Sequence, residues 1–329
     1  MLSPISSIIN SVNRTDRPLN ILCAPTHESY ETNLAKTGHT FYAYHAEGIK
    51  TWGTEYRECP SNYICLDGTK GINQIPSWVD FDLVLSQNKF GQFQVLAPIA
   101  RHLQLPLISL EHTLPFPMWQ HEKKEACRHM RGDTDVFISD YSIDEWKFER
   151  DENVQVIKHC VDPIFIPSDI EKQPHILSVV NDWVSRNWCC NFEGWQRITQ
   201  GLPTKVLGDT PGLSQPAPSL DLLVQEYQSA QVFLNTSTIS PVPSVLLEAM
   251  SCGCAVVTTA TCMIPEIIEH GVNGLISNDE TELRGYCEDL LKDESLRIKL
   301  GKAARDTVVS QFNIERFTKE WNEVFHNVL

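Results

Sequence analysis

Short apolar runs alternate with segments of helical periodicity along most of this 329-residue chain. Such runs are typical of strands buried on both faces of a sheet, and the segments between them suit crossover helices. The alternation therefore predicts an α/β protein with parallel sheets. Because the chain has about twice the usual length of one domain, we predict two domains and exclude a single small module.

The apolar runs form two groups, separated at 161–175 by a stretch rich in proline and acidic residues. This composition suits a crossing between domains, and we place the boundary there. A helix is predicted over Phe93–Leu103 in the first group. The predicted strands are, in the first group, Leu19–Ala24, Thr40–Tyr44, Asp82–Ser86, Pro106–Leu110 and Val136–Ser139, and in the second, Ile176–Val180, Lys205–Leu207, Val232–Leu234 and Ala255–Thr258.

The segment from residue 313 onward predicts an amphipathic helix that must dock on another part of the protein. Its apolar side chains recur at spacings of three and four residues, which places on one face Phe317, Trp321, Val324, Phe325 and Val328. We therefore divide the chain into an N-terminal domain at 1–165, a C-terminal domain at 166–312 and a terminal helix at 313–329.

The charge balance argues against a general nucleic-acid binder. The chain has 27 Lys and Arg against 42 Asp and Glu, a net charge of −15. Such a protein has no overall attraction toward nucleic-acid phosphates or anionic membranes, although a local basic groove is compatible with it. With 42% hydrophobic and 21% charged residues, the composition also excludes a disordered or fibrous chain.

The cysteines and the apolar runs together predict a cytoplasmic protein. Eleven cysteines are scattered along the chain, and none forms the C-x-x-C pattern of a zinc or thioredoxin-type site. Reduced thiols are the simpler interpretation. Residues 1–20 lack an apolar run of signal-peptide length and suit a short leader before the first strand. No run reaches the roughly 18 apolar residues that span a bilayer.

The segment Ser237–Val257 carries the chemistry. Pro243 and Ser244 signal a helix start, with Ser244 as the expected N-cap of a helix over Val245–Cys252 that closes at Gly253. In an open α/β sheet, a helix start after a strand offers backbone N–H groups to an anion such as a diphosphate. Glu248, one turn into this helix, could reach ligand hydroxyls. Alternatively, it is a carboxylate favoured by the helix dipole.

Three ordered motifs in the second half carry a family resemblance. They run from Pro243 to Val257, from Ile264 to Ile268 and from Gly271 to Ile276. Together they resemble the C-terminal domain of retaining glycosyltransferases of family 4, the glycosyl transferases group 1. Weaker similarities to the same family occur at 109–113, 135–139 and 156–167.

The resemblance implies a GT-B fold, in which two Rossmann-like domains face a cleft and a C-terminal helix returns to the first domain. Such enzymes move a sugar from a nucleotide diphosphate donor to an acceptor hydroxyl with retention, usually without a metal. It implies His112 as the catalytic residue beside the sugar, Glu248 on the ribose, and the backbone of Val245 and Leu246 on the phosphates. The full implied donor site is Glu248, Arg186, Ser240, Val242, Ser244, Val245 and Leu246. For His112, a polar strand-end histidine bonded to a loop is the alternative.

The chain departs from the family pattern at the donor site. Ser240 stands where the family has a Glu, and Pro241, which has no N–H, replaces a Gly. Arg186 can take the usual Arg position, whereas Glu193 stands where a Lys is expected. Lys205 could substitute for that Lys or be a solvated residue at a strand start.

Three further features have structural alternatives. His27 and Glu28, in the first strand-end loop, could face the cleft or cap the next helix. The pairs Asp80/Asp82 and Asp133/Asp135 have the spacing of a metal motif, but each precedes an apolar strand, where a flanking Asp is common. We do not count them as metal ligands, and no metal or other cofactor is expected.

Three functions compete. The first is a retaining glycosyltransferase acting on a glycan or lipid-linked saccharide, with at most peripheral membrane association. The second is a glycosyltransferase acting on modified DNA bases, which would need a positive strip of Lys123, Lys124, Arg128 and Arg131 at the cleft. The third, motivated by Ser240, Pro241 and Glu193, is a catalytically silent GT-B subunit that pairs with an active enzyme.

Overall fold

The structure, a computed structural model, describes residues 17–54 and 57–329 of the chain. The leader predicted within residues 1–20 lies almost entirely outside these ranges. The described residues divide into two compact units. The first takes in the described part of Met1–Phe137 together with Trp146–Ile157 and Thr318–Leu329, and the second consists of Ile138–Glu145 and Lys158–Phe317. The predicted boundaries, at 165/166 and 312/313, thus differ from those of the observed units.

The first unit is built on a seven-stranded parallel sheet in the order β3-β2-β1-β4-β5-β6-β7. The strands β1 to β6 reproduce the 3-2-1-4-5-6 order of a Rossmann fold. Register pairs Ile21 of β1 with Phe41 of β2 and with Leu83 of β4. The strands are β1 Asn20–Cys23, β2 Thr40–Ala43, β3 Tyr63–Cys65, β4 Leu83–Ser86, β5 Leu107–Glu111, β6 Thr134–Phe137 and β7 Val154–Val156.

The second unit is built on a five-stranded parallel sheet in the order β12-β11-β10-β8-β9. Numbered within this unit, the order is 2-1-3-4-5 read from the β9 edge, which is the other common order of doubly wound sheets. The strands are β8 Gln173–Val179, β9 Thr204–Leu207, β10 Ala230–Asn235, β11 Ala255–Thr258 and β12 Leu275–Ile276.

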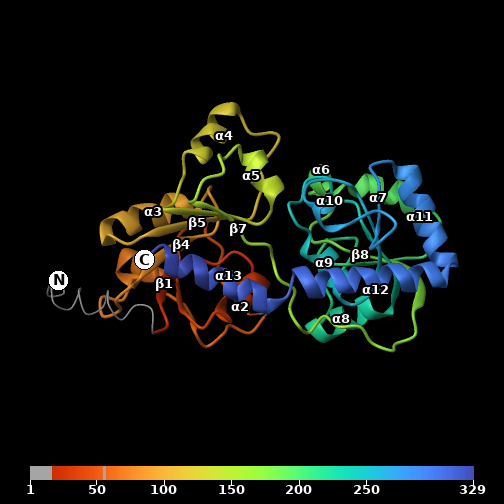
Figure 1. The fold of residues 1–329 in the computed structure, drawn as a ribbon, viewed down its shortest axis with the longest axis horizontal. Helices are drawn as coiled ribbons and strands as arrows, with labels where there is room; N and C mark the ends of the chain where they lie inside the picture. The colour runs from red at the N-terminus through yellow and green to blue at the C-terminus, as the bar shows by residue number, and fades with distance from the viewer. Residues whose placement is uncertain (1–16, 55–56) are drawn as a thin grey trace. The chain divides into compact units, whose positions relative to one another are not determined.

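Helices cover both faces of each sheet (Figure 1). In the second unit, α8, α9 and α12 pack together on one face, and α7 and α11 pack together on the other. The helices are α2 Glu28–Ala35, η1 Gly68–Gln74, α3 Gln92–Leu103, α4 His121–Arg128, α5 Asp140–Trp146, α6 Asn187–Cys190, α7 Phe192–Thr199, α8 Leu220–Ser229, α9 Ser244–Ser251, α10 Ile264–Ile267, α11 Glu280–Lys292, α12 Glu294–Gln311 and α13 Ile314–Asn327.

The predicted amphipathic helix at the end of the chain forms as α13, and it docks within the first unit from Thr318 onward. The Trp321 indole Nε1 donates to the Tyr30 hydroxyl of α2 at 3.1 Å. Phe325 packs its ring against Phe41 of β2 and His39. Trp321 and Phe325 are fully buried, so the apolar face of the helix completes the core of this unit.

The predicted fold class is confirmed in its parallel sheets and alternating helices. All nine predicted strands form, with ends shifted by one to three residues in most cases. The strand predicted at the end of the Gly271–Ile276 motif forms as β12, and two strands were missed, β3 and β7. Both are three residues long and lie at the edges of the sheet, where the apolar pattern is weakest.

Candidate functional site

Each sheet has one point where the strand order reverses, and ligands of open α/β sheets bind beside the strand ends at such a point. In the second unit it lies between β8 and β10. The loops that leave these two strands are 180–186, which contains Arg186, and 236–243, which contains Ser240 and Val242. The topology therefore brings two sequence-distant parts of the predicted donor site to adjacent strand ends.

The loop after β10 is held in place mainly through its backbone. The Cys189 carbonyl of α6 accepts hydrogen bonds from the amides of Thr238 at 2.8 Å and Ile239 at 3.1 Å. On the other side, the Ser237 carbonyl accepts from the hydroxyl of Thr261, after β11, at 3.0 Å. The loop is thus fastened to both neighbouring segments, and its shape does not depend on charged side chains.

The start of α9 differs from the prediction in one respect. Pro243 occupies the N-cap position, makes no side-chain cap hydrogen bond, and Ser244 is the first residue of the helix. The prediction of Ser244 as the N-cap was therefore wrong, because the extended backbone of Pro243 lets the helix begin one residue early. Ser244 is exposed and Val245 half-buried, and amides at this position of a helix have no intrahelical acceptor. The Leu246 amide already donates to the Pro243 carbonyl at 3.0 Å, which weakens its predicted role toward phosphate.

Glu248 of α9 is half-buried and held by a residue that sequence reasoning missed. The hydroxyl of Tyr227, a fully buried residue of α8, donates to Glu248 Oε2 at 2.9 Å. Burial, followed by the charge of Glu248, raises the pKa of Tyr227, so the hydroxyl stays a donor. One carboxylate oxygen of Glu248 is therefore fixed by the protein, which orients the other. The pairing depends on how α8 packs beside α9, and no sequence spacing indicates it.

Arg186 is exposed and precedes α6, close to the loop it is predicted to serve. Its Nη1 donates to the Asn181 carbonyl at 3.4 Å. A hydrogen bond from the Cys190 thiol, together with the positive charge of Arg186, lowers the pKa of the buried Cys189 thiol. The Arg186 guanidinium therefore places a positive charge at an exposed position of this strand-end region, where an anionic ligand could reach it.

The residue at the expected Lys position, Glu193, and the candidate substitute, Lys205, differ in their surroundings. Glu193 is exposed, and its amide donates to Asn187 Oδ1 at 3.0 Å. Lys205 lies in β9 and forms an ion pair of 2.5 Å with Glu226 of α8. This pair agrees with the interpretation of Lys205 as a residue of the strand surface rather than a substitute phosphate ligand.

In the first unit the strand order reverses between β1 and β4, and the next strand is β5. His112 follows β5 and is half-buried. Its Nε2 lies 3.4 Å from Oε1 of Gln87, the residue that follows β4. The imidazole also meets the ring of Tyr30 edge-on, with a centroid separation of 4.5 Å, and the ring of His27 at 6.5 Å. His112 is therefore at the predicted strand end, among residues of the β1 and β4 loops.

Helix α2, which follows the loop after β1, contains a buried carboxylate that the sequence analysis did not single out. Glu31 is fully buried and accepts from the Thr26 amide at 2.9 Å and from Gln87 Nε2 at 2.7 Å. Burial raises the pKa of Glu31 to about 7, although hydrogen bonds from Thr26 and Gln87 oppose the shift. The site of the first unit is therefore a network of side chains rather than of backbone groups.

His27 and Glu28 do not cap α2 through their side chains. His27 stands at the N-cap position without a side-chain cap hydrogen bond. Glu28 forms an ion pair of 2.6 Å with Lys50 and accepts from the Gly53 amide at 2.9 Å. The capping alternative is thus wrong for both, and Glu28 instead ties down a neighbouring loop.

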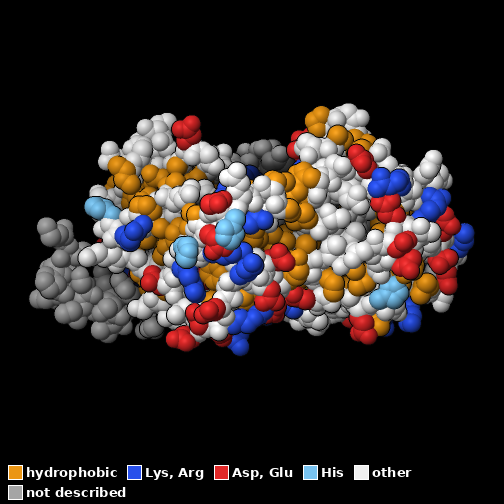
Figure 2. Space-filling model, turned by 90° about the horizontal axis from the view of Figure 1, so that it is seen from above, with side chains coloured by type: hydrophobic (Ala, Val, Ile, Leu, Met, Phe, Trp, Pro, Cys, Tyr) orange, Lys and Arg blue, Asp and Glu red, His pale blue; other side chains and the backbone are white. Residues whose placement is uncertain are grey.

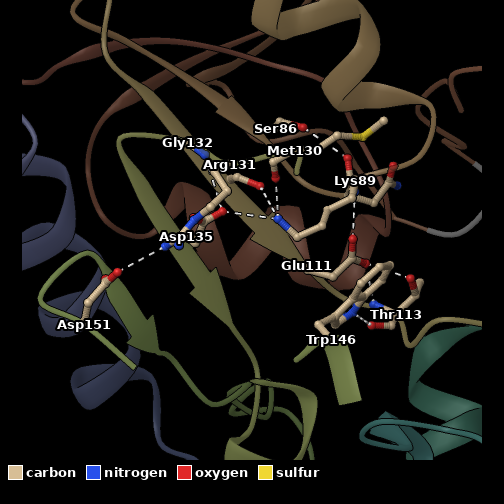
Figure 3. A network of polar contacts seen from close by, with 12 residues as sticks. Ser86, Lys89, Glu111, Thr113, Met130, Arg131, Gly132, Asp135, Trp146 and Asp151 are labelled. Atoms are coloured by element: carbon tan, nitrogen blue, oxygen red, sulfur yellow. Dashed lines mark hydrogen bonds and ion pairs between the residues drawn. The ribbon is translucent and has the colours of Figure 1, made fainter. Parts of the chain in front are cut away.

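A second network includes both chain neighbours of His112, Glu111 and Thr113, and fixes the end of β5 (Figure 3). The fully buried Lys89 contacts Asp135 at 3.2 Å, Ser109 Oγ at 3.2 Å and the Met130 carbonyl at 2.7 Å. Glu111 accepts from the Lys89 amide at 2.7 Å and from the Thr113 amide at 2.8 Å. Burial lowers the pKa of Lys89 and raises that of Glu111, while their mutual attraction opposes both shifts. The network holds the backbone on both sides of His112.

The two Asp-x-Asp pairs have structural partners. Asp82 forms an ion pair of 2.8 Å with Arg17, and Asp133 accepts from the Leu107 amide at 2.8 Å. Asp135 is bonded to both Lys89 and Arg131. Among the described residues, no three His, Cys, Asp or Glu side chains are grouped as a metal ion would require.

The sequence profile of the glycosyl transferases group 1 family matches residues 217–307, which run from the end of the β9–α8 loop into α12. Residues 217–307 thus match this family, and we call them the group 1 domain. The match includes α9 with Glu248 and the two motifs that follow it. The resemblance inferred from the sequence is thereby confirmed at the level of this family.

Relatives and solved structures extend the comparison beyond the group 1 domain. The chain is 38% identical over 87 residues to N-acetyl-alpha-D-glucosaminyl L-malate synthase of Bacillus anthracis, which is 26% of this chain and 23% of that protein. It is 26% identical over 219 residues to spore coat protein SA of Bacillus subtilis, or 65% of this chain and 54% of the relative. The matches thus span about half of these relatives or less.

The solved structures share the fold at low identity. A crystal structure of Anabaena Alr3699/HepE in complex with UDP superposes with a TM-score of 0.73 at 14% identity, covering 94% of this chain and all of that one. The predicted GT-B fold is confirmed. The family match and the named relatives support the predicted transferase enzyme. Over the described ranges, none of the helices has the length and apolar character needed to cross a membrane.

Proposed function

We propose that this protein transfers a sugar from a nucleotide diphosphate sugar to a hydroxyl of a glycan or lipid-linked saccharide, with retention at the anomeric carbon. The observation that carries the proposal is the strand-end site of the group 1 domain. This site lies at the point where the strand order of the second sheet reverses. The segments at or beside that point contain the start of α9, Arg186, and Glu248, which Tyr227 holds. The Anabaena protein of the same fold has also been crystallised with UDP-glucose.

The chemistry required is stabilisation of a leaving diphosphate as the sugar becomes oxocarbenium-like. The positive end of the α9 dipole, with the amides of Ser244 and Val245, can hold the diphosphate, and Arg186 adds a mobile positive charge. Glu248, held by Tyr227, can accept hydrogen bonds from the ribose hydroxyls. His112 contacts the sugar in this proposal. We propose no metal, because the helix start and Arg186 supply the charge stabilisation.

Acceptors made of DNA receive less support. Arg128 is paired with Glu125, and Arg131 with Asp135 and Asp151, so two of the four cations of the hypothetical strip are already neutralised. Lys123 lies over the Trp119 ring at 4.2 Å. On the face shown in Figure 2, Lys and Arg side chains are interspersed with acidic ones. These pairs favour a saccharide acceptor.

The compartment we propose is the cytoplasm, with at most peripheral membrane association. All eleven cysteines lie within the described ranges and none is in a disulfide. Thiols in this state are typical of a reducing compartment, where nucleotide sugars are also the accessible donors.

A thermal-shift screen across nucleotide sugars, followed by donor hydrolysis, tests the proposal. We expect one donor to raise the melting temperature and to release free sugar slowly. Glu248→Ala and Arg186→Ala should abolish both effects. Arg197→Ala, which removes an exposed cation of α7 paired with Glu280, is the matched control and should change neither. If no nucleotide sugar shifts the melting temperature, the enzyme proposal fails and the silent GT-B subunit is favoured.

A further inference from the structure

We propose that Gln87 is a positioning residue that holds His112 in one tautomer, with the proton on Nε2 and the lone pair on Nδ1. The inference rests on the proposed function insofar as His112 contacts the sugar. Gln87 acts through the imidazole. It follows β4 at the point where the strand order of the first sheet reverses.

The orientation of the Gln87 amide follows from its partners. Nε2 lies 3.0 Å from the carbonyl oxygen of Ala24 and 2.7 Å from a carboxylate oxygen of Glu31. A carbonyl oxygen can only accept hydrogen bonds, so the NH₂ group must face Ala24. Turning the amide over would set two acceptor oxygens against each other at a fully buried site, which costs the desolvation of both.

The protonation state of Glu31 does not alter this result. A protonated Glu31 could donate to Gln87, but the Ala24 carbonyl would still require the NH₂ group on that side. The main-chain N–H of Gln87 donates to Oε1 of Gln92 at 3.0 Å, and this bond does not involve the side-chain amide. Gln87 therefore stays oriented throughout the pH range in which Glu31 titrates.

Gln87 Nε2 is thus bonded to Ala24 and Glu31. The other atom of the amide, Oε1, lies 3.4 Å from His112 Nε2 and 3.5 Å from Thr26 Oγ1. An acceptor oxygen favours the imidazole tautomer that has a proton on the facing nitrogen. Nδ1 is then the nitrogen that accepts a proton or a hydrogen bond. The 3.4 Å separation is at the long end of hydrogen-bond distances.

Several titratable groups surround His112 and bear on its behaviour with pH. His27 and Tyr30 face the ring from the segment at the start of α2, and Glu31 of the same helix lies behind Gln87. Glu111 precedes His112 in the chain and is bonded to Thr113 and Lys89. Through its side-chain amide, Gln87 links Glu31 to the Nε2 side of the imidazole.

The direct test is a long-range proton–nitrogen NMR correlation of the imidazole nitrogens in the full chain, without nucleotide sugar. The His112 signals are assigned by their loss in His112→Asn. In the wild type above the titration range of His112, we expect the pattern of a protonated Nε2 and an unprotonated Nδ1. A wild-type pattern with the proton on Nδ1 would overturn the inference, whatever the variants do.

Two matched variants separate positioning from general packing. Gln87→Met removes the oriented oxygen and should shift the signals toward a mixture of tautomers. Gln92→Met removes a second buried amide of the same region, which contacts the Pro25 carbonyl and the Gln87 backbone but does not contact His112. It should leave the wild-type tautomer. An unchanged His112 pattern in folded Gln87→Met, checked by circular dichroism, contradicts the inference.

Donor hydrolysis supplies a separate readout. Gln87→Met should lower kcat about fivefold to tenfold with the donor KM unchanged, the effect of one neutral hydrogen bond. Gln92→Met should change kcat less than twofold at equal folded fraction. If the NMR result is as expected but neither the variants nor the wild type hydrolyse a donor, the proposed function fails while the role of Gln87 stands.

Discussion

In each unit, different chemical groups fix the loops at the point where the strand order reverses. In the second unit, the loop after β10 is fixed by backbone groups, prolines and neutral hydroxyls, and Arg186 remains exposed. In the first unit, buried ionisable side chains define the strand ends: Glu31, Lys89, Glu111 and Asp135. A loop that backbone groups hold in place tolerates changes at most of its side chains. A network of buried charges depends on every member, because the loss of one leaves its partners unpaired.

The largest effect should come from breaking the buried network of the first unit. Lys89→Met leaves Asp135 and Glu111 buried without their shared cation, so we expect a loss of about 3–5 kcal/mol in the free energy of unfolding. Urea titration followed by tryptophan fluorescence measures it. Lys205→Met, which breaks the exposed pair with Glu226, should cost under about 1 kcal/mol. Equal losses in the two variants would remove the contrast between the two units.

The buried Glu31 should make the stability of the protein depend on pH. Its folded-state pKa is raised to about 7 from 4.5, so the unfolded chain loses this proton first and stability falls between those values as pH rises. Glu31→Gln should therefore stabilise the protein by up to about 3 kcal/mol at pH 8 and have little effect at pH 4. Melting temperatures across this range measure the difference.

Glu28→Gln serves as the control of opposite sign. Burial acts to raise the pKa of Glu28, but hydrogen bonds from Lys50 and Gly53 lower it overall. This carboxylate therefore adds stability above its unfolded pKa, and the contribution is lost as pH falls through its folded pKa. The variant should destabilise at pH 8 and not at pH 3. A destabilising effect of Glu31→Gln at pH 8 would contradict the raised pKa of Glu31.

The backbone-built edge of the second unit should be sensitive to an added methyl group. Gly208 follows β9 with a φ of +113°, and a Cβ there would lie 2.2 Å from the Val180 carbonyl oxygen. Gly208→Ala should cost about 2–3 kcal/mol and speed amide exchange in the loop after β8. Gly212→Ala, at a φ of +79° with open space around it, should cost about 1 kcal/mol. Indistinguishable exchange in the two variants would contradict a role for close backbone packing.

The smallest effect should come from Tyr227→Phe, which removes the hydroxyl bonded to Glu248. We expect about fivefold weaker donor binding, corresponding to one hydrogen bond of roughly 1 kcal/mol. Isothermal titration with the donor identified by thermal shift measures it. Tyr286→Phe removes another tyrosine hydroxyl beside a glutamate, Glu282, on α11, and should leave the affinity unchanged. An affinity equal to wild type in Tyr227→Phe would show that Glu248 needs no orienting partner.

The same contrast explains what could be predicted from the sequence. Strand β11 was predicted to the residue and α9 within one, because consecutive glycine, proline and apolar positions record local backbone geometry. Tyr227, Gln87 and Glu31 were not predicted. Each acts through a partner that the strand order or helix packing brings close, and a single sequence contains no signal for that proximity. The Ser244 cap failed for a local reason, since the preceding proline took the cap position.

The docking of α13 has a consequence for how the protein is made. Tyr30, near the start of the chain, receives its hydrogen bond from Trp321, 291 residues later, and Phe41 packs on Phe325. Residues 158–317 of the second unit are synthesised before these partners. All residues of the second unit are therefore present before all those of the first, which until then has an uncovered apolar patch on α2 and β2. The synthesis of the first unit therefore begins first and ends last. We expect a nascent-chain chaperone to protect this unit.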